Sequence, residues 1–248
     1  MSMPEPGSGE NIELLPQRAP AWMRGLVDAV AAGHTNAAVP EINRRKPRVP
    51  DSRIKGAAVL MLFSGAETTA ELPADAEVLL THRNPRLRSH SGQIAFPGGR
   101  IDAEDKNVVD TALREAWEET GLDRHHVSPL ATLPELHIMT SGFPIWPVLG
   151  HWHIRGDVRV ASPDELDEVL AVPVQELINP ENRLMVGKEF WRGPAFRING
   201  YLVWGFTGGL LSAIIESAGW EEPWDKNTTH SLAEAVENSR NNEATRLW

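Results

Sequence analysis

Residues 96–122 constrain the fold of this chain more than any other segment. The segment begins with Phe-Pro-Gly-Gly and continues into a run with helical periodicity. Asn107 suits the N-cap position, Asp110 suits the positive end of the helix dipole, and Gly121 suits a left-handed residue after the last turn. The apolar residues of the run recur at helical spacing, as on the buried stripe of a packed helix: Ala112, Leu113, Ala116 and Trp117. The segment therefore predicts a helix that begins after Asn107 and ends before Gly121.

Three glutamates of this helix are spaced so that they share one face. Glu115, Glu118 and Glu119 stand at i, i+3 and i+4, where like charges destabilise a bare helix by a few tenths of a kcal/mol for each pair. A divalent cation such as Mg²⁺ turns this repulsion into a binding site, because it takes carboxylate oxygens and bridges them to phosphates. The alternative is a solvated acidic face, and we expect Glu119 to lie on a solvent-facing stripe. The preceding Gly98–Gly99 turn, which can approach an anion closely, favours metal-assisted chemistry on a phosphate ester or anhydride, with Arg114 steering a carboxylate.

The composition excludes several classes of protein. The 248 residues contain no cysteine, which excludes disulfides, thiolate metal sites and cysteine nucleophiles. The formal net charge of −10 argues against a protein that tracks nucleic-acid phosphates over its whole surface. No apolar run approaches the roughly 18 residues of a membrane span, and residues 1–10 show no secretory signal. We therefore expect a cytoplasmic protein with no nucleic-acid or membrane partner, whose oligomeric state is open.

The chain divides into three zones. Residues 1–52 form an extension with one short helix, expected over residues 21–31, and a basic, proline-broken linker at residues 43–48. Residues 53–222 form the main domain, and residues 223–248 form a polar tail that we expect to be frayed or weakly helical. The main domain has apolar runs typical of strands at 59–63, 78–81, 127–136 and 145–154, and helical patterns at 173–178 and 204–218. This order predicts an α/β fold, a mixed sheet with helices packed on it.

The acidic helix resembles the core of a known family. Residues 114–122, Arg-Glu-Ala-Trp-Glu-Glu-Thr-Gly-Leu, are similar at every fixed position to the Nudix hydrolase motif, Arg-Glu-apolar-x-Glu-Glu-x-Gly-apolar. The front half of the motif departs from the usual one, which has a Glu six residues after the Gly and seven residues between that Glu and the Arg. This chain has Gly99, then Asp105, then eight residues before Arg114. The resemblance therefore carries no metal role over to Asp105.

Residues upstream of the helix resemble the coenzyme A pyrophosphatase branch of the same family. Residues 79–99 contain Leu-Leu-Thr, a spaced arginine at Arg88, then Gly92, and then Phe-Pro-Gly-Gly, with three residues in each of the last two intervals. That branch shares the lengthened spacing before Arg114. Asn84 stands where a small Ser, Thr or Ala is expected.

The resemblance implies a fold and a reaction. The fold is expected to be the Nudix α/β/α sandwich, with the acidic helix at the catalytic cleft. The reaction is expected to be hydrolysis of coenzyme A or an acyl-CoA at the pyrophosphate, with Mg²⁺ or Mn²⁺ as cofactor. The products are adenosine 3′,5′-bisphosphate and 4′-phosphopantetheine or its acyl form. Glu118 and Glu119 match the metal ligands of the family, and Glu115 matches a residue that binds metal or helps to activate water.

The general base of Nudix enzymes varies and often comes from a later loop. Glu165 and Glu168 are the candidates in this chain. The alternative interpretation is a solvated acidic turn, which these two residues form together with Asp164 and Asp167.

A basic run belongs to the upstream motif. Arg83, Arg86 and Arg88 can grip phosphate through paired hydrogen bonds, although an exposed loop of arginines is often merely solvated. We expect Arg83 and Arg88 to bind substrate together with Gly98 and Gly99, and Arg88 to meet the 3′-phosphate of coenzyme A.

Two rival functions remain open at this point. The first is another Nudix pyrophosphatase, acting on ADP-ribose, NADH or a dinucleoside polyphosphate. The second is a Nudix-fold binding or regulatory module without turnover. Such a module is expected to have lost carboxylates from the helix, whereas Glu115, Glu118 and Glu119 are all present.

Overall fold

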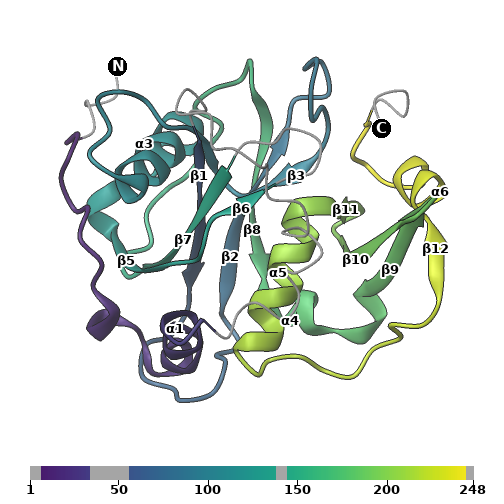
Figure 1. The fold of residues 1–248 in the computed structure, drawn as a ribbon, viewed down its shortest axis with the longest axis horizontal. Helices are drawn as coiled ribbons and strands as arrows, with labels where there is room; N and C mark the ends of the chain where they lie inside the picture. The colour runs from purple at the N-terminus through teal and green to yellow at the C-terminus, as the bar shows by residue number, and fades with distance from the viewer. Residues whose placement is uncertain (1–6, 34–55, 138–143, 244–248) are drawn as a thin grey trace.

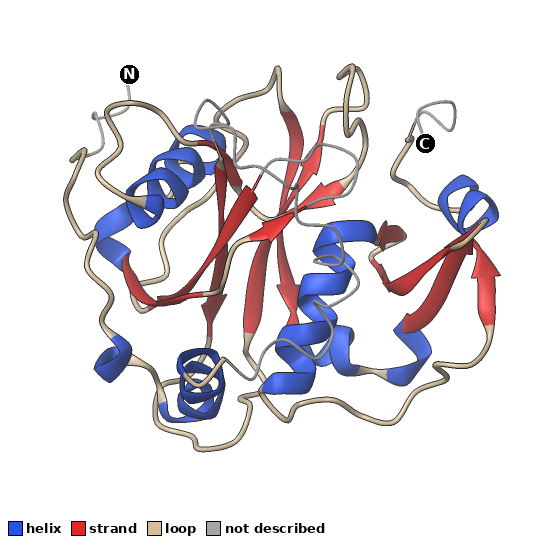
Figure 2. Cartoon of the chain, viewed as in Figure 1, coloured by secondary structure: helices blue, strands red, loops and turns tan. Residues whose placement is uncertain are grey.

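The computed structural model describes residues 7–33, 56–137 and 144–243, which form a larger sheet flanked by helices and a smaller sheet beside it (Figures 1 and 2). The strands are β1 (Ala57–Ser64), β2 (Glu77–Arg83), β3 (Ile94–Ala95), β4 (Gly98–Arg100), β5 (Val127–Thr132), β6 (Leu136–His137), β7 (Pro144–Trp152), β8 (Leu166–Pro173), β9 (Arg183–Lys188), β10 (Trp191–Ile198), β11 (Tyr201–Val203) and β12 (Thr229–Ser231). The α-helices are α1 (Arg24–Ala31), α3 (Val108–Thr120), α4 (Val174–Ile178), α5 (Gly205–Ser217) and α6 (Leu232–Glu237). Short 3-10 turns are η1 (Pro16–Arg18), η2 (Ala21–Met23), η4 (Arg124–His126) and η5 (Pro180–Asn182).

The larger sheet is mixed, as the sequence predicts. Its strands run in the order β3-β2-β1-β7-β5, with β4 paired to β1, β6 to β7 and β8 to β2. The pairing of β1 with β7 is parallel, and the other pairings in this sheet are antiparallel. The two central strands, β1 and β7, are almost wholly buried, as expected for strands covered on both faces.

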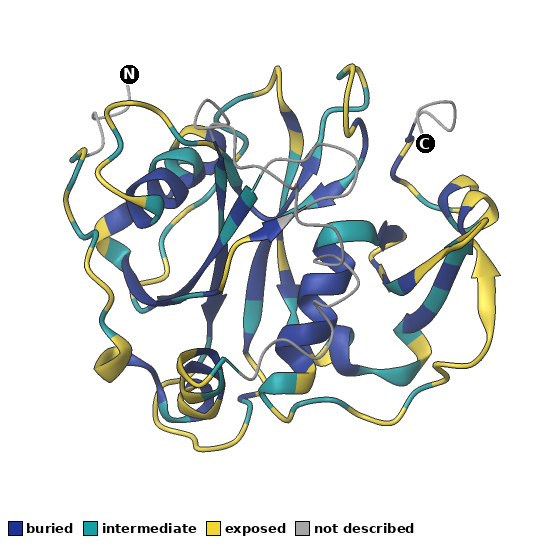
Figure 3. Ribbon diagram, in the orientation of Figure 1, coloured by how far each residue is buried: buried dark blue, intermediate teal, exposed yellow. Residues whose placement is uncertain are grey.

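Helices cover both faces of this sheet. Successive side chains of a strand point to opposite faces, and β1 follows this rule. Leu60 and Leu62 join the core under α3, whereas Met61 and Phe63 join the core under α1 and α5. Helix α5 is buried along most of its length (Figure 3). The predicted α/β/α arrangement is confirmed, with α3 on one face and α1 and α5 on the other.

Most of the predicted elements are found. The runs at 59–63 and 78–81 lie in β1 and β2, and the run at 145–154 corresponds to β7. The run at 127–136 is divided between β5 and the start of β6, and the helical pattern at 204–218 is α5.

Two helix predictions need a small correction. The helix expected at 21–31 begins as the 3-10 turn η2 and becomes α1 at Arg24. Pro173 is the N-cap residue of α4 and not its first helical residue. The basic linker at 43–48 lies outside the described residues.

Of the two alternatives for the tail, frayed or weakly helical, the frayed one is wrong for residues 229–243, and the helical one is found at α6. Strand β12 pairs in parallel with β9, and so extends the smaller sheet, whose order is β11-β10-β9-β12. Leu232 and Val236 of α6 are buried against Leu184, Val186 and Leu202 of that sheet. Two apolar side chains one helical turn apart therefore help to dock a segment whose composition is polar.

Helix α3 is fixed at both ends by the residues that the sequence predicts. The Asn107 side chain accepts hydrogen bonds from the N–H groups of Val109 and Asp110, and Gly121 ends the helix with φ of 72°. The buried stripe is confirmed for Ala112, Leu113 and Ala116, but Trp117 is only half-buried and Val109 is buried instead.

A buried ion pair anchors the first turn of α3. Asp110 Oδ1 lies 2.8 Å from Arg124 Nη1, and both side chains are almost fully buried. Arg124 also donates to the carbonyl oxygens of Gly7 and Glu10, and the Gly9 N–H donates to Asp110. Burial raises the pKa of Asp110, but hydrogen bonds from the Lys106 N–H, Arg124 and the Gly9 N–H outweigh burial, and the net pKa is below its usual value. The N-terminal segment is thereby tied to the helix that carries the glutamates.

Within the described residues, no helix is both long and apolar enough to cross a membrane.

Candidate active site

Strand β4 brings two glycines against the acidic face of α3. Gly98 has φ of 157°, and a Cβ there would collide with the Ala58 carbonyl oxygen and lie 2.7 Å from the Val59 Cα. A Cβ on Gly99 would lie 2.6 Å from Glu115 Oε1. Only residues without a side chain let β4 pair with β1 and approach the carboxylates this closely.

The three glutamates of α3 differ in their surroundings. Glu119 is 3% exposed, and its Oε2 accepts a hydrogen bond of 3.0 Å from the Gly98 N–H. The side chain of Glu115 is 15% exposed and that of Glu118 is 45% exposed. The expectation that Glu119 faces solvent is therefore wrong, because β4 covers it.

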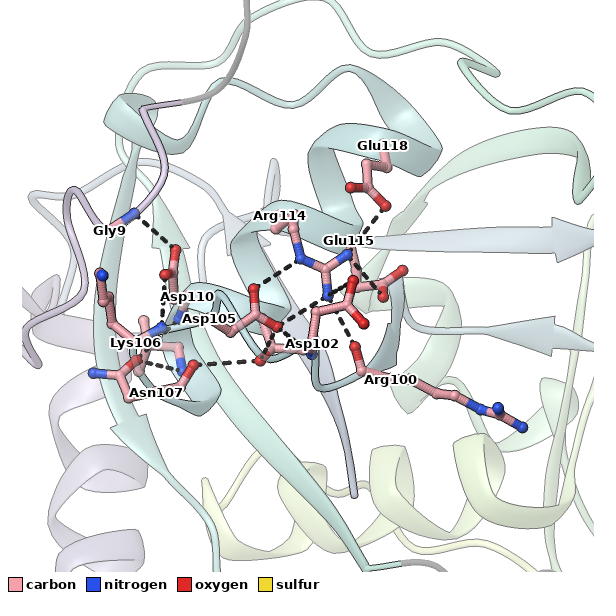
Figure 4. A network of polar contacts seen from close by, with 12 residues as sticks. Gly9, Arg100, Asp102, Asp105, Lys106, Asn107, Asp110, Arg114, Glu115 and Glu118 are labelled. Atoms are coloured by element: carbon pink, nitrogen blue, oxygen red, sulfur yellow. Dashed lines mark hydrogen bonds and ion pairs between the residues drawn. The ribbon is translucent and has the colours of Figure 1, made fainter. Parts of the chain in front are cut away.

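Arg114 is the main positive partner of this face (Figure 4). Its guanidinium lies 3.1 Å from Glu115 Oε1 and 3.1 Å from Glu118 Oε2. It also donates to Asp105 from Nε and Nη2, at 2.9 and 3.0 Å, and to the Arg100 carbonyl oxygen at 2.8 Å. These contacts, the hydrogen bonds to Asp105 foremost, raise the pKa of Arg114 further, so that it stays charged. Arg114 is therefore in contact with the carboxylates of both Glu115 and Glu118.

Asp105 is a partner of Arg114. It accepts hydrogen bonds from Arg114, from Thr111 Oγ1 at 2.8 Å and from the Asp102 N–H at 2.8 Å. Burial raises the pKa of Asp105, but these hydrogen bonds outweigh burial and leave the pKa below its usual value. The shorter carboxylate and the longer spacing thus place Asp105 behind the arginine, where it holds Arg114 in position.

Nearby positive charges do not fully offset the burial of two of the glutamates, Glu115 and Glu119. Burial raises the pKa of Glu119 to about 8, and the negative charges of Glu115 and Glu165 add to this rise, whereas the Gly98 N–H and Arg83 oppose it. Burial also raises the pKa of Glu115 to about 7, although Arg114 opposes the rise. Carboxyl groups in this condition take up a proton or a cation.

These residues fit a hard divalent cation. The donors are carboxylate oxygens, which Mg²⁺ and Mn²⁺ prefer, and a cation would supply the positive charge that Glu115 and Glu119 lack. Within residues 7–33, 56–137 and 144–243, no three acidic or histidine side chains already converge as a metal cage. Glu115 and Glu118 instead contact Arg114, and Glu119 contacts Gly98.

The structure separates the two candidates for the general base. Glu165 is exposed and close enough to raise the pKa of both Glu115 and Glu119. Glu168 accepts a hydrogen bond from the Tyr201 hydroxyl and lies 3.7 Å from Arg240. These contacts of Glu168 belong to a different polar network from that of α3.

The upstream arginines also differ in position. Arg83, at the end of β2, lies close enough to Glu119 for its positive charge to oppose the rise of the Glu119 pKa. Arg86 and Arg88 are exposed on the loop that follows β2. Asn84, the residue at odds with the motif, accepts from the Arg86 N–H and donates to the Pro163 carbonyl oxygen, which its longer side chain makes possible.

Residues of the C-terminal part of the chain lie beside this loop and were missed by the sequence reasoning. Asn241 and Glu243 are buried, and the Asn241 carbonyl oxygen contacts His82 of β2. Two buried polar residues inside a polar segment produce no hydrophobic periodicity, so the sequence does not indicate that they are buried.

The raised pKa of the buried Glu119 carboxyl predicts a pH dependence of stability. The folded pKa of about 8 lies above the ordinary 4.5, so stability is greatest below the ordinary pKa and declines as pH rises through the folded pKa. In chelator, the melting temperature of the wild type should fall by several degrees between about pH 6 and about pH 9, and that of Glu119→Gln should fall less. Glu118→Gln, a change at an exposed neighbour, serves as the control and should follow the wild type. Equal slopes for wild type and Glu119→Gln in thermal melts contradict this prediction.

Comparison with known proteins places this geometry in a family. Residues 56–192 match the NUDIX domain. The Citrobacter koseri protein described as "Uncharacterized Nudix hydrolase NudL" is 36% identical over 145 residues, which cover 54% of this chain and 71% of that protein. The protein "Nudix hydrolase 15, mitochondrial" of Arabidopsis thaliana is 33% identical over 168 residues, which cover 63% of this chain and 56% of that protein.

A solved structure shows a weaker likeness. The Nudix hydrolase RenU from M. smegmatis is 19% identical, covers 70% of this chain and 91% of its own, and superimposes with a TM-score of 0.46. The family match spans more than half of the chain and includes both β4 and α3. The chain belongs to the NUDIX domain family, as a relative of the Nudix hydrolases.

Proposed function

We propose that this chain hydrolyses the pyrophosphate bond of coenzyme A or an acyl-CoA, with Mg²⁺ or Mn²⁺. One observation carries the hydrolase part of the proposal: Glu115, Glu118 and Glu119 gather on α3 beside the Gly98–Gly99 strand, and two of them lack a full counter-charge. Such a site suits a substrate that brings phosphate groups together with a divalent cation.

The glutamates would hold the cation, which neutralises the diphosphate and acidifies an attacking water when it is bound. Glu118 is already exposed, whereas Glu115 and Glu119 would each lose a proton on binding. The Gly98 N–H holds Glu119 in place, and Arg114 holds Glu115 and Glu118. The positions of the carboxylates are therefore largely set before substrate arrives, which lowers the cost of ordering them.

Glu165 is the better of the two candidates for the residue that accepts the proton of the water. It is exposed and its charge acts on the same carboxyl groups that would hold the cation. Glu168 is engaged with Tyr201. A base must reach the proton that it removes, directly or through one water, and this favours Glu165.

The choice of coenzyme A rests on the upstream motif. Arg83 is near Glu119, and so near the place proposed for the diphosphate, whereas Arg88 stands farther along the exposed loop. One arginine at the end of β2 and another on the loop that follows suit a substrate with a diphosphate and a separate 3′-phosphate. ADP-ribose and NADH lack that separate phosphate, so a preference for either of them would favour the rival Nudix pyrophosphatase.

The test of the proposed activity is a product analysis. Purified protein incubated with coenzyme A and Mg²⁺ or Mn²⁺ should release adenosine 3′,5′-bisphosphate, and excess chelator should abolish the reaction. Glu119→Gln should lose most turnover, because it removes one charged ligand while keeping the contact with Gly98. Chromatography of the products distinguishes the possible activities. Hydrolysis of ADP-ribose or NADH alone would support the rival pyrophosphatase, and binding without turnover of any of these compounds would support the binding module.

A second prediction concerns Arg88. A hydrogen bond to a charged group contributes about 1.5–3 kcal/mol, so Arg88→Ala should lower kcat/KM for coenzyme A by roughly ten- to a hundredfold. Dephospho-coenzyme A lacks only the 3′-phosphate, and its kcat/KM should be lower than that of coenzyme A in the wild type and nearly unchanged by the substitution. Steady-state kinetics with both substrates measure this. An equal loss on both would show that Arg88 does not recognise the 3′-phosphate.

A further inference from the structure

The last described residues of the chain fold back onto the loop that carries the exposed arginines. We call residues 84–92, which lie between β2 and β3, the arginine loop, and residues 239–243 the C-terminal clasp. The two segments are far apart in sequence but meet at His82, the residue of β2 just before Arg83. Neither the charge of the C-terminal region nor its composition predicts this contact.

Asn241 fixes the clasp to the edge of the smaller sheet. Its Oδ1 accepts from the Leu202 N–H at 2.9 Å, and its Nδ2 donates to the Leu202 carbonyl oxygen at 2.9 Å. The side-chain amide therefore pairs with β11 as a neighbouring strand would. Nδ2 also donates to Glu243 Oε1 at 2.6 Å. Asn241 is 0% exposed, so every one of these bonds is made away from water.

His82 joins the clasp to the arginine loop. Its Nε2 lies 3.0 Å from the Asn241 carbonyl oxygen and 3.1 Å from the Gly92 carbonyl oxygen. Both partners can only accept, so Nε2 carries a hydrogen and donates to both. The other ring nitrogen, Nδ1, lies 2.5 Å from Asp167 Oδ1. A buried side chain of β2 is thus shared between the loop and the clasp.

The backbones of the loop and the clasp are in close contact at Gly92. Gly92 has φ of 71°, and a Cβ there would collide with the Asn241 carbonyl oxygen and lie 3.0 Å from the Glu243 nitrogen. The Glu243 carboxylate also accepts hydrogen bonds from Gln93 and from Trp204 Nε1. One end of the arginine loop is therefore packed directly on the clasp.

The other end of the loop is held separately. The Asn84 N–H donates to the Glu165 carbonyl oxygen at 2.8 Å, and Asn84 Nδ2 donates to the Pro163 carbonyl oxygen at 3.1 Å. Arg86 and Arg88 are exposed between these two attachments. The Gly92 end is also tied to β2, because the Gly92 N–H donates to the Arg83 carbonyl oxygen at 3.1 Å. Releasing the clasp would therefore remove one of the supports of this end and loosen the loop.

We propose that Asn241 is a positioning residue, which holds the arginine loop through the clasp so that the loop meets the substrate in a fixed conformation. Asn241 touches no part of the proposed catalytic centre and acts through His82 and Gly92. The identity of the substrate rests on the proposed function, whereas the holding of the loop does not.

The test compares two adjacent substitutions of the same chemistry. Asn241→Asp replaces the donor Nδ2 by an oxygen that faces the Leu202 carbonyl and Glu243. Asn242→Asp adds the same charge at an exposed neighbour, whose φ of 54° aspartate tolerates. Asn242→Asp controls for the change in net charge, and Asn241→Ala separates the loss of the buried hydrogen bonds from the burial of a charge.

The first measurement is limited trypsin digestion, because trypsin cuts after Arg86 and Arg88 when the loop opens. The reference is cleavage after Arg155, an exposed residue in the segment that follows β7. Asn241→Asp should accelerate loop cleavage relative to the reference by about tenfold, and Asn242→Asp should not. A folded Asn241→Asp protein with the wild-type cleavage ratio overturns the proposal. Asn241→Ala removes the same side-chain bonds without adding a charge and is the substitute if Asn241→Asp does not fold.

The second measurement is the KM and kcat for coenzyme A. A loosened loop must be ordered again by the substrate, so KM should rise by about tenfold while kcat changes by less than about threefold. Gly92→Ala disturbs the same contact from the loop side, and the double variant with Asn241→Asp should be no worse than either single one. Faster loop cleavage with an unchanged KM overturns the role in substrate positioning. A wild type that leaves coenzyme A intact contradicts the proposed function instead, and the cleavage ratio then decides on the clasp alone.

Discussion

The carboxyl groups of Glu115 and Glu119 are held out of water beside a glycine strand, and the folded chain supplies too little positive charge for both to ionise easily. Burial is the main cause, since it raises the pKa of Glu115 to about 7 and that of Glu119 to about 8. Isolated buried charges are costly unless they are paired or bind a cation. The chain accepts this cost beside β4, and much of the surrounding structure holds Glu115 and Glu119 in position.

The framework around the site explains how the carboxylates stay in position. Helix α3 is anchored through the buried pair of Asp110 and Arg124, which also binds the N-terminal segment. Strand β4 is held against β1, and its Gly98 N–H fixes Glu119. Arg114, backed by Asp105, neutralises part of the charge of Glu115 and Glu118. Each element that touches the glutamates is thus fixed independently by the rest of the fold.

Local signals allowed much of this to be predicted from sequence. Helix α3, with its cap at Asn107 and its end at Gly121, is specified by residues that are close together in the sequence. The spacing that places Glu115, Glu118 and Glu119 on one face is a local signal of the same kind. The burial of Glu119 could not be predicted, because it results from the approach of β4. The clasp depends on Asn241 meeting Leu202 and His82, which stand far away in sequence. Polar residues that are buried by such distant partners produce no hydrophobic periodicity in the sequence, so sequence analysis cannot identify them.

We expect the α3 carboxylates to bind a divalent cation in exchange for protons. Calorimetric titration of Mn²⁺ into chelator-treated protein at about pH 7, in buffers of different ionisation enthalpy, measures both the affinity and the protons released. The wild type should bind Mn²⁺ with release of protons, because Glu115 and Glu119 hold protons in the absence of the cation. Glu119→Gln should lose most of the affinity and part of the proton release. Mn²⁺ binding that is undiminished in Glu119→Gln, or that releases no proton in the wild type, would show that these carboxyl groups do not exchange protons for a cation.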